Sequence, residues 1–215
     1  PPEQQRALLA EGAQRLQSYT GAYPAAFRAG NMAASEETLR QLEALGIYLD
    51  SSYSFPFLGG QCLFTDTTAY NGSKWYGKVL ELALSGFYQP RLPGLKPAKP
   101  FDLMGISFPE CRDAIIKTAA AGADSVLILH SFSLFKVRNK QYEGGRLNRI
   151  VTHRFRRLCR WLAEYPQEYP VYTFSDLAGA LAAGQYTAKS VTPCRLASPR
   201  AIVRKAVQAL NNLYW

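Results

Sequence analysis

Apolar residues recur at helical spacing in several segments, and short apolar runs typical of buried strands lie between these segments. Ser35 and Gly46 mark the start and stop of one expected helix, and Pro109 opens another. Because helices alternate with short strands, the pattern predicts an α/β fold with a parallel sheet or barrel. Further helices are expected over 3–18, 152–164 and 199–213, and strands over 47–49, 79–84, 126–129 and 171–174.

Two stretches show neither the helical nor the strand-like spacing of apolar residues. Residues 53–78 are rich in aromatic residues, glycine and threonine, which predicts a loop-rich insertion. Residues 86–102 contain four prolines, which exclude a regular helix or a central strand. We expect this second stretch to be a long loop, either lying over the mouth of a functional site or serving as a plain surface connection.

The composition fits a globular domain with one sizeable core, and the chain of 215 residues has a formal charge of +9. The basic excess concentrates in 138–160 and 195–205 and does not form an aromatic-interleaved stripe, so we interpret it as a solvated basic face that could also help to dock an anionic glycan. Specific nucleic-acid binding would rest on charge alone and is not expected. No apolar run reaches the length of a membrane span, so no transmembrane segment is expected. Localisation and oligomeric state stay open.

His130 is the most informative single residue, because it follows the apolar run 126–129 and precedes Ser131. A histidine at a strand end, followed by small polar residues, points into the mouth of a site, and its ordinary pKa near ~6.5 suits a general acid. The other interpretation is a hydrogen-bonded core histidine. His153, the second histidine, lies on a basic helix and is expected at the surface.

Arg28 and Asp50 also end apolar segments. Arg28 stands between an aromatic and two small residues, which is typical of an arginine held by a carboxylate, in a functional site or in a structural ion pair. Asp50 is either a turn cap that uses Ser51 and Ser52 or a partner of His130. Since each residue ends a strand of a parallel pattern, Arg28, Asp50 and His130 are expected to converge around an open concavity at one end of the sheet.

Three short segments, in this order, resemble the later motifs of the polysaccharide deacetylase family, the NodB-like carbohydrate esterases. Phe27-Arg28-Ala29-Gly30 resembles the third motif, Leu49-Asp50-Ser51-Ser52 the fourth, and Ile128-Leu129-His130 the fifth. The chain departs from the family in having Ala-Gly where many members have Pro-Tyr, in lacking the tryptophan of the fourth motif, and in having isoleucine where leucine is usual in the fifth. The similarity spans about residues 3–183.

The resemblance implies an incomplete, distorted (β/α) barrel over residues 1–183, followed by a linker and a basic amphipathic helix over 184–215. It implies a metal-dependent hydrolase that removes acetyl groups from an acetylated polysaccharide or glycan. In this assignment His130 is the general acid, Arg28 orients the carboxylate of the general base, and Asp50 tunes the histidine. The substrate-binding positions that follow are Ile128 and Leu129, which shape a small acetyl pocket, and Asn31 and Ser131 beside them.

The metal ligands of the family are absent from this sequence. They form an aspartate motif and a His-x-x-x-His motif upstream of the arginine motif, whereas His130 and His153 are the only histidines here. The implied cofactor, a divalent metal with zinc as the expected ion, therefore has no ligands in this chain. The chain either represents the C-terminal majority of the domain, takes ligands from a separate segment or chain, or is a degenerate homologue.

The main alternative function is a catalytically inactive, carbohydrate-binding homologue of the same fold. In that case aromatic side chains would stack on sugar rings, with Tyr53, Phe55, Trp75 and Tyr76 as the candidates.

Overall fold

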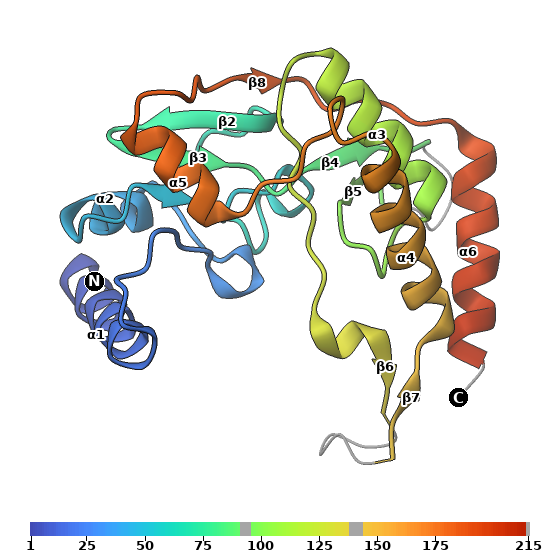
Figure 1. The fold of residues 1–215 in the computed structure, drawn as a ribbon, viewed down its shortest axis with the longest axis horizontal. Helices are drawn as coiled ribbons and strands as arrows, with labels where there is room; N and C mark the ends of the chain where they lie inside the picture. The colour runs from blue at the N-terminus through green and yellow to red at the C-terminus, as the bar shows by residue number, and fades with distance from the viewer. Residues whose placement is uncertain (91–95, 138–143, 214–215) are drawn as a thin grey trace. The chain divides into compact units, whose positions relative to one another are not determined.

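The computed structural model describes residues 1–90, 96–137 and 144–213, which form a mixed α/β structure with six α-helices and small sheets (Figure 1). None of the sheets in these described ranges closes on itself. None of the described helices is long and apolar enough to cross a membrane. The chain forms two compact units: unit 1 consists of Pro1–Ser85, Gly122–Val126 and Tyr172–Thr192, and unit 2 of Gly86–Ala121, Leu127–Val171 and Pro193–Trp215.

Unit 1 begins with two helices at the predicted places, α1 (Pro2–Thr20) and α2 (Glu36–Ala44). Ser35 and Thr38 form a reciprocal capping box at the start of α2, and Gly46 follows the helix in the left-handed conformation, with φ of 75°. The least exposed residues of α1 include Leu9, Ala10 and Ala13, and polar bonds join Gln5 to Thr38 and Arg6 to Gln41 of α2. The apolar side chains Leu8 and Leu16 of α1 are exposed.

The sheet of unit 1 has four strands in the order β1-β3-β2-β8. Only β1 and β3 run parallel, and Phe27 adds a further parallel bridge beside Asp50 of β1. The stretch 53–78, predicted as a loop-rich insertion, is irregular over most of its length but also contains β2, which pairs on one side with β8, far along the chain. A side chain at Gly72 of β2 would clash with the carbonyl oxygen of Lys189, so this pairing requires glycine. The strands are β1 (Leu49–Asp50), β2 (Asn71–Tyr76), β3 (Val79–Leu82) and β8 (Ser190–Val191).

Unit 2 is built from three helices, α3 (Phe108–Ala120), α4 (Arg149–Glu164) and α6 (Ser198–Leu213), with two short hairpins (Figure 1). Its core is apolar and lies among these elements; it includes Phe87, Phe101, Leu103, Ile106, Leu158 and Trp161. The hairpins pair β4 (Gly86–Tyr88) with β5 (Ala98–Pro100) and β6 (Phe135–Lys136) with β7 (Arg146–Leu147).

The proline-rich stretch 86–102 is therefore not loop throughout, since its two ends pair as β4 and β5. Pro100 is tolerated in β5 because this sheet has only two strands. Residues 91–95, in the middle of the expected loop, lie outside the described residues.

Two predicted strands are absent as regular strands from the described structure. The run 126–129 makes only isolated bridges, at Val126 with Leu84 and at Ile128 with Asp102, and only Val126 in it is buried. The segment 171–174 is exposed, with Val171 at 72%, and leads directly into α5 (Phe174–Ala182). Thr173 caps α5, and this local hydrogen bonding competes with strand formation.

Candidate functional site

Arg28 rests on the turn that follows β1. Its Nε donates a hydrogen bond to the carbonyl oxygen of Ser51 at 2.9 Å, and its Nη2 donates to the Ser51 hydroxyl at 2.8 Å. The guanidinium carbon also lies 5.4 Å from the centre of the Phe174 ring. Arg28 is thus held by a serine and an aromatic ring, and the charges of Asp50 and Glu81 act on it without forming an ion pair within the described residues. Burial lowers the pKa of Arg28, and these two carboxyl groups oppose that effect.

Asp50 is completely buried and caps its own turn. Its Oδ2 accepts a hydrogen bond from the Ser52 amide at 3.0 Å, and its Oδ1 accepts one from the Ser52 hydroxyl at 2.9 Å. The Ser52 hydroxyl oxygen in turn accepts the amide of Ala29 at 2.8 Å. The turn-cap interpretation of Asp50 is therefore what the structure shows, and the turn is tied directly to the segment that carries Arg28.

Glu81 is a site residue that the sequence analysis did not single out. The parallel pairing of β1 with β3 places it directly beside Asp50, and both side chains are 0% exposed. Its Oε1 accepts the Tyr53 amide at 2.9 Å, while its Oε2 has no hydrogen-bond partner among the described residues. The available signal was a single carboxylate inside the apolar run 79–84.

Burial dominates the protonation of this carboxyl pair. It raises the pKa of Glu81 well above the usual range, and the adjacent Asp50 raises it further. Burial also raises the pKa of Asp50, although interactions with Glu81 and with Ser52 oppose it. Two carboxyl groups that share one buried site cannot both ionise easily, so we infer that Glu81 holds a proton at neutral pH.

His130 is exposed and belongs to unit 2. It precedes the short 3₁₀ helix η3 (Ser131–Leu134), and its ring stacks on Phe132 with the two centres 4.7 Å apart. The alternative of a core histidine is therefore wrong. His153 is exposed on α4, as predicted.

The predicted substrate-binding residues have different surroundings. Ile128 is half-buried, and its amide and carbonyl bond to Phe101 and Leu103. Leu129 packs against the core of unit 2, whereas Ser131 is exposed. In unit 1, Asn31 is exposed in a tight turn with φ of 54°, a conformation that asparagine tolerates better than most residues.

The structure thus brings Arg28 and the Asp50 turn together within unit 1. His130 lies in unit 2 with Ile128, Leu129 and Ser131. The convergence of Arg28, Asp50 and His130 stays a prediction.

The described residues do not fit the metal that the resemblance implies. They contain no group of three or more histidine, cysteine, aspartate or glutamate side chains that could hold an ion. Asp50 and Glu81 supply only two carboxyl groups, and burial raises the pKa of both.

No protein-family model, no curated protein and no solved structure matches this chain. The function is therefore argued from the residues of the chain itself.

Proposed function

We propose that this protein hydrolyses acetyl groups from an acetylated glycan, and that residues 1–183 belong to an incomplete, distorted (β/α) barrel of the polysaccharide deacetylase type. The observation that supports this most is the contact of Arg28 with Ser51. It joins two motifs whose residues are 23 positions apart in the sequence, at the ends of neighbouring parallel segments. The resemblance identifies these segments as the third and fourth motifs, which we expect to meet at one end of the sheet.

In this proposal each side chain has a distinct role. His130, which is accessible, gives a proton to the leaving group. Arg28, fixed by its two bonds to Ser51, orients an acidic catalytic group. Asp50 holds the turn on which Arg28 rests, and its proposed effect on His130 depends on the convergence described above. The described residues contain no group of three candidate metal ligands, so the metal that the resemblance implies would need ligands from outside them.

Acetate release tests the proposal. The protein that contains this chain is incubated with N-acetylated and with O-acetylated oligosaccharides, and free acetate is measured. We expect His130→Ala to lower kcat by about 10²–10⁴-fold, the usual contribution of a general acid. Tyr19→Ala is the matched control because it also removes an exposed ring, which is 85% exposed at the end of α1, and it should leave kcat unchanged. Equal activity of the two variants, or no acetate from either substrate class, would contradict the proposal.

A binding protein that does not hydrolyse the glycan is the second candidate. It is favoured by the lack of a metal-binding group among the described residues. Its sugar-stacking surface is smaller than expected, because Tyr53 is 0% exposed and stacks on Tyr70, and Phe55 is 7% exposed. Trp75, at 48% exposure, and the half-buried Tyr76 are the aromatic candidates that stay accessible. Glycan binding that Trp75→Ala weakens, without acetate release, would favour this function.

A further inference from the structure

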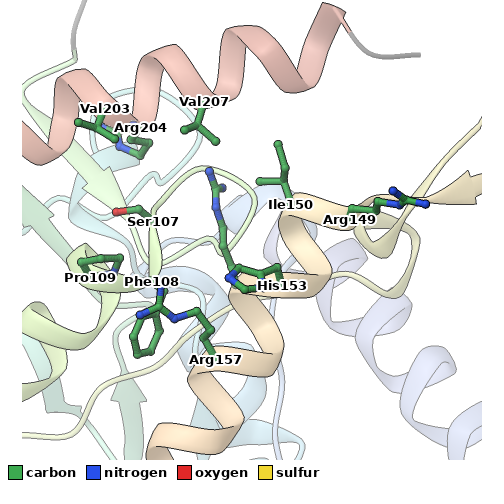
Figure 2. A pocket seen from close by; sticks show the side chains of 11 residues that line it. Ser107, Phe108, Pro109, Arg149, Ile150, His153, Arg157, Val203, Arg204 and Val207 are labelled. Atoms are coloured by element: carbon green, nitrogen blue, oxygen red, sulfur yellow. The ribbon is translucent and has the colours of Figure 1, made fainter.

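Unit 2 contains a pocket of about 490 Å³ bounded by the start of α3, by α4 and by α6 (Figure 2). This volume is within the range of about 300–1,000 Å³ that small-molecule sites occupy. None of the predicted site residues lines it. The pocket is therefore separate from the site of the proposed function.

Basic side chains gather along one side of this pocket. Arg149, His153, Arg154 and Arg157 all come from α4, where residues three to four positions apart share a face. Arg204 enters from α6. The pocket thus combines four guanidinium groups with one imidazole.

Only one of these guanidinium groups is neutralised by a carboxylate among the described residues. Arg204 pairs with Glu110 at 3.0 Å, and both side chains are 2% exposed. Arg149, Arg154 and Arg157 form no ion pair within the described part of the chain. Their charges are the surplus that an anionic ligand would balance.

Arg154 adds to this excess of positive charge a cation whose burial costs free energy. It is 6% exposed, and its Nη1 donates to the carbonyl oxygens of Met104 at 2.8 Å and Leu103 at 3.3 Å. Burial lowers the pKa of Arg154, and the charges of Glu110 and Asp102 oppose that effect only in part. Carbonyl oxygens satisfy donors but carry no net charge, so a further anion in the pocket would stabilise this buried cation. The amino end of α3, at Ser107, adds the positive end of the helix dipole to the same pocket.

The remaining walls are apolar or aromatic. Phe108 lies beneath Arg157, whose guanidinium carbon is 4.5 Å from the ring centre, and Ile150 and Val207 face the same space (Figure 2). A ligand that fills this pocket therefore needs an organic part as well as a charged group.

We propose that this pocket binds a phosphate monoester. Three unpaired guanidinium groups match a dianion better than a single carboxylate, and their planar donors fit phosphate oxygens in pairs. The apolar walls then accommodate the organic group of the ester. This site does not depend on the deacetylase proposal.

Calorimetric titration with phenyl phosphate tests the site, with benzoate as the matched monoanion and phenol as the uncharged analogue. We expect phenyl phosphate to bind more tightly than benzoate, and phenol not to bind. Arg157→Gln should weaken phenyl phosphate by about tenfold, the loss of one charge-assisted interaction. Arg160→Gln removes the same charge from an exposed position on α4 outside the pocket and should change the affinity less than about twofold.

Acetate release, measured in parallel, separates the two proposals, because the phosphate site is judged by binding alone. Equal weakening by Arg157→Gln and Arg160→Gln would overturn the site, as would benzoate binding at least as tightly as phenyl phosphate. An absence of phenyl phosphate binding at millimolar concentration would overturn it as well.

The ester can come from a soluble molecule or from a lipid, and a second measurement distinguishes them. Phosphatidylcholine vesicles with phosphatidic acid, whose headgroup is a phosphate monoester, are sedimented with the protein. If the protein sediments with the vesicles, and both phenyl phosphate and the Arg157→Gln substitution reduce that sedimentation, the ester comes from a lipid. Calorimetric binding without sedimentation assigns the soluble source, and both results support the site.

Discussion

Each unit of this protein buries a glutamate, and the two are stabilised in different ways. Glu110 of unit 2 is 1% exposed and pairs with Arg204 at 3.0 Å. Its other oxygen accepts hydrogen bonds from the amide of Ser107 at 2.9 Å and from the hydroxyl at 2.6 Å. Glu81 of unit 1 is 0% exposed, accepts one amide from Tyr53, and lies beside another carboxyl group, that of Asp50.

This difference shows that burial alone does not determine the charge of a carboxyl group. A cation and several donors offset the desolvation of an ionised carboxylate, as they do around Glu110. Where no cation is in contact, the group is stabilised by keeping its proton, and the pKa of Glu81 is raised by burial first and by Asp50 second. The same residue type therefore serves as half of an ion pair in one unit and as a neutral acid in the other.

Matched glutamine substitutions give the largest expected effect. Glu110→Gln leaves Arg204 buried without its counter-ion, so we expect it to lower the free energy of unfolding by about 3–5 kcal/mol. Glu81→Gln replaces a protonated carboxyl by a neutral group of the same shape, so it should cost less than about 1 kcal/mol near pH 4. At pH 7 it should not destabilise the protein, because only the wild type bears the cost of keeping that proton. Urea unfolding of both variants measures the difference. Equal losses would show that Glu81 is ionised like Glu110.

The pH dependence of stability gives the next effect. Because the folded state holds the Glu81 proton more tightly than the unfolded chain, its contribution is complete below the ordinary glutamate pKa of about 4.3 and is lost as pH rises through the raised pKa. Within that window, the free energy of unfolding should fall by about 1.4 kcal/mol per pH unit relative to Glu81→Gln. Urea unfolding at several pH values measures both slopes. Parallel curves for the wild type and Glu81→Gln would contradict a shared proton.

Much of the helical structure could be predicted from the sequence, because helix signals are local. Ser35 and Gly46 delimit α2, and Pro109 lies in the first turn of α3, as expected. Strand β2 pairs mainly with the adjacent β3 across the turn at Gly77 and Lys78, which is a local hairpin signal. Only its shorter pairing with β8, more than a hundred residues later, lies beyond what local composition carries.

The site was also predicted only in part, because local sequence signals mark some of its residues and not others. Arg28 and Asp50 stood out because each follows an apolar run, and the Phe27–Asp50 bridge brings them to one turn. Glu81 could not be found this way, because its role depends on the register that pairs it with Asp50. A one-residue shift would place Glu81 on the other face of the sheet.

The smallest expected effect concerns Ser107, which caps α3 and donates to Glu110. Ser107→Ala removes the cap and one donor to the buried carboxylate, so we expect a loss of about 1 kcal/mol in the free energy of unfolding. The loss should be smaller in the Glu110→Gln background, because a neutral amide oxygen accepts the serine hydrogen bond more weakly than a carboxylate.

A double-mutant cycle measures this coupling, which we expect to be at least about 0.5 kcal/mol because the two side chains are in contact. Glu81→Gln is the matched background, since Glu81 belongs to unit 1 and bonds to Tyr53 of the same unit. There the two losses should add within about 0.3–0.5 kcal/mol. If the coupling energy between Ser107 and Glu81 were as large as that between Ser107 and Glu110, the two buried glutamates would not respond independently. The contrast between an ion-paired and a protonated carboxyl group would then be contradicted.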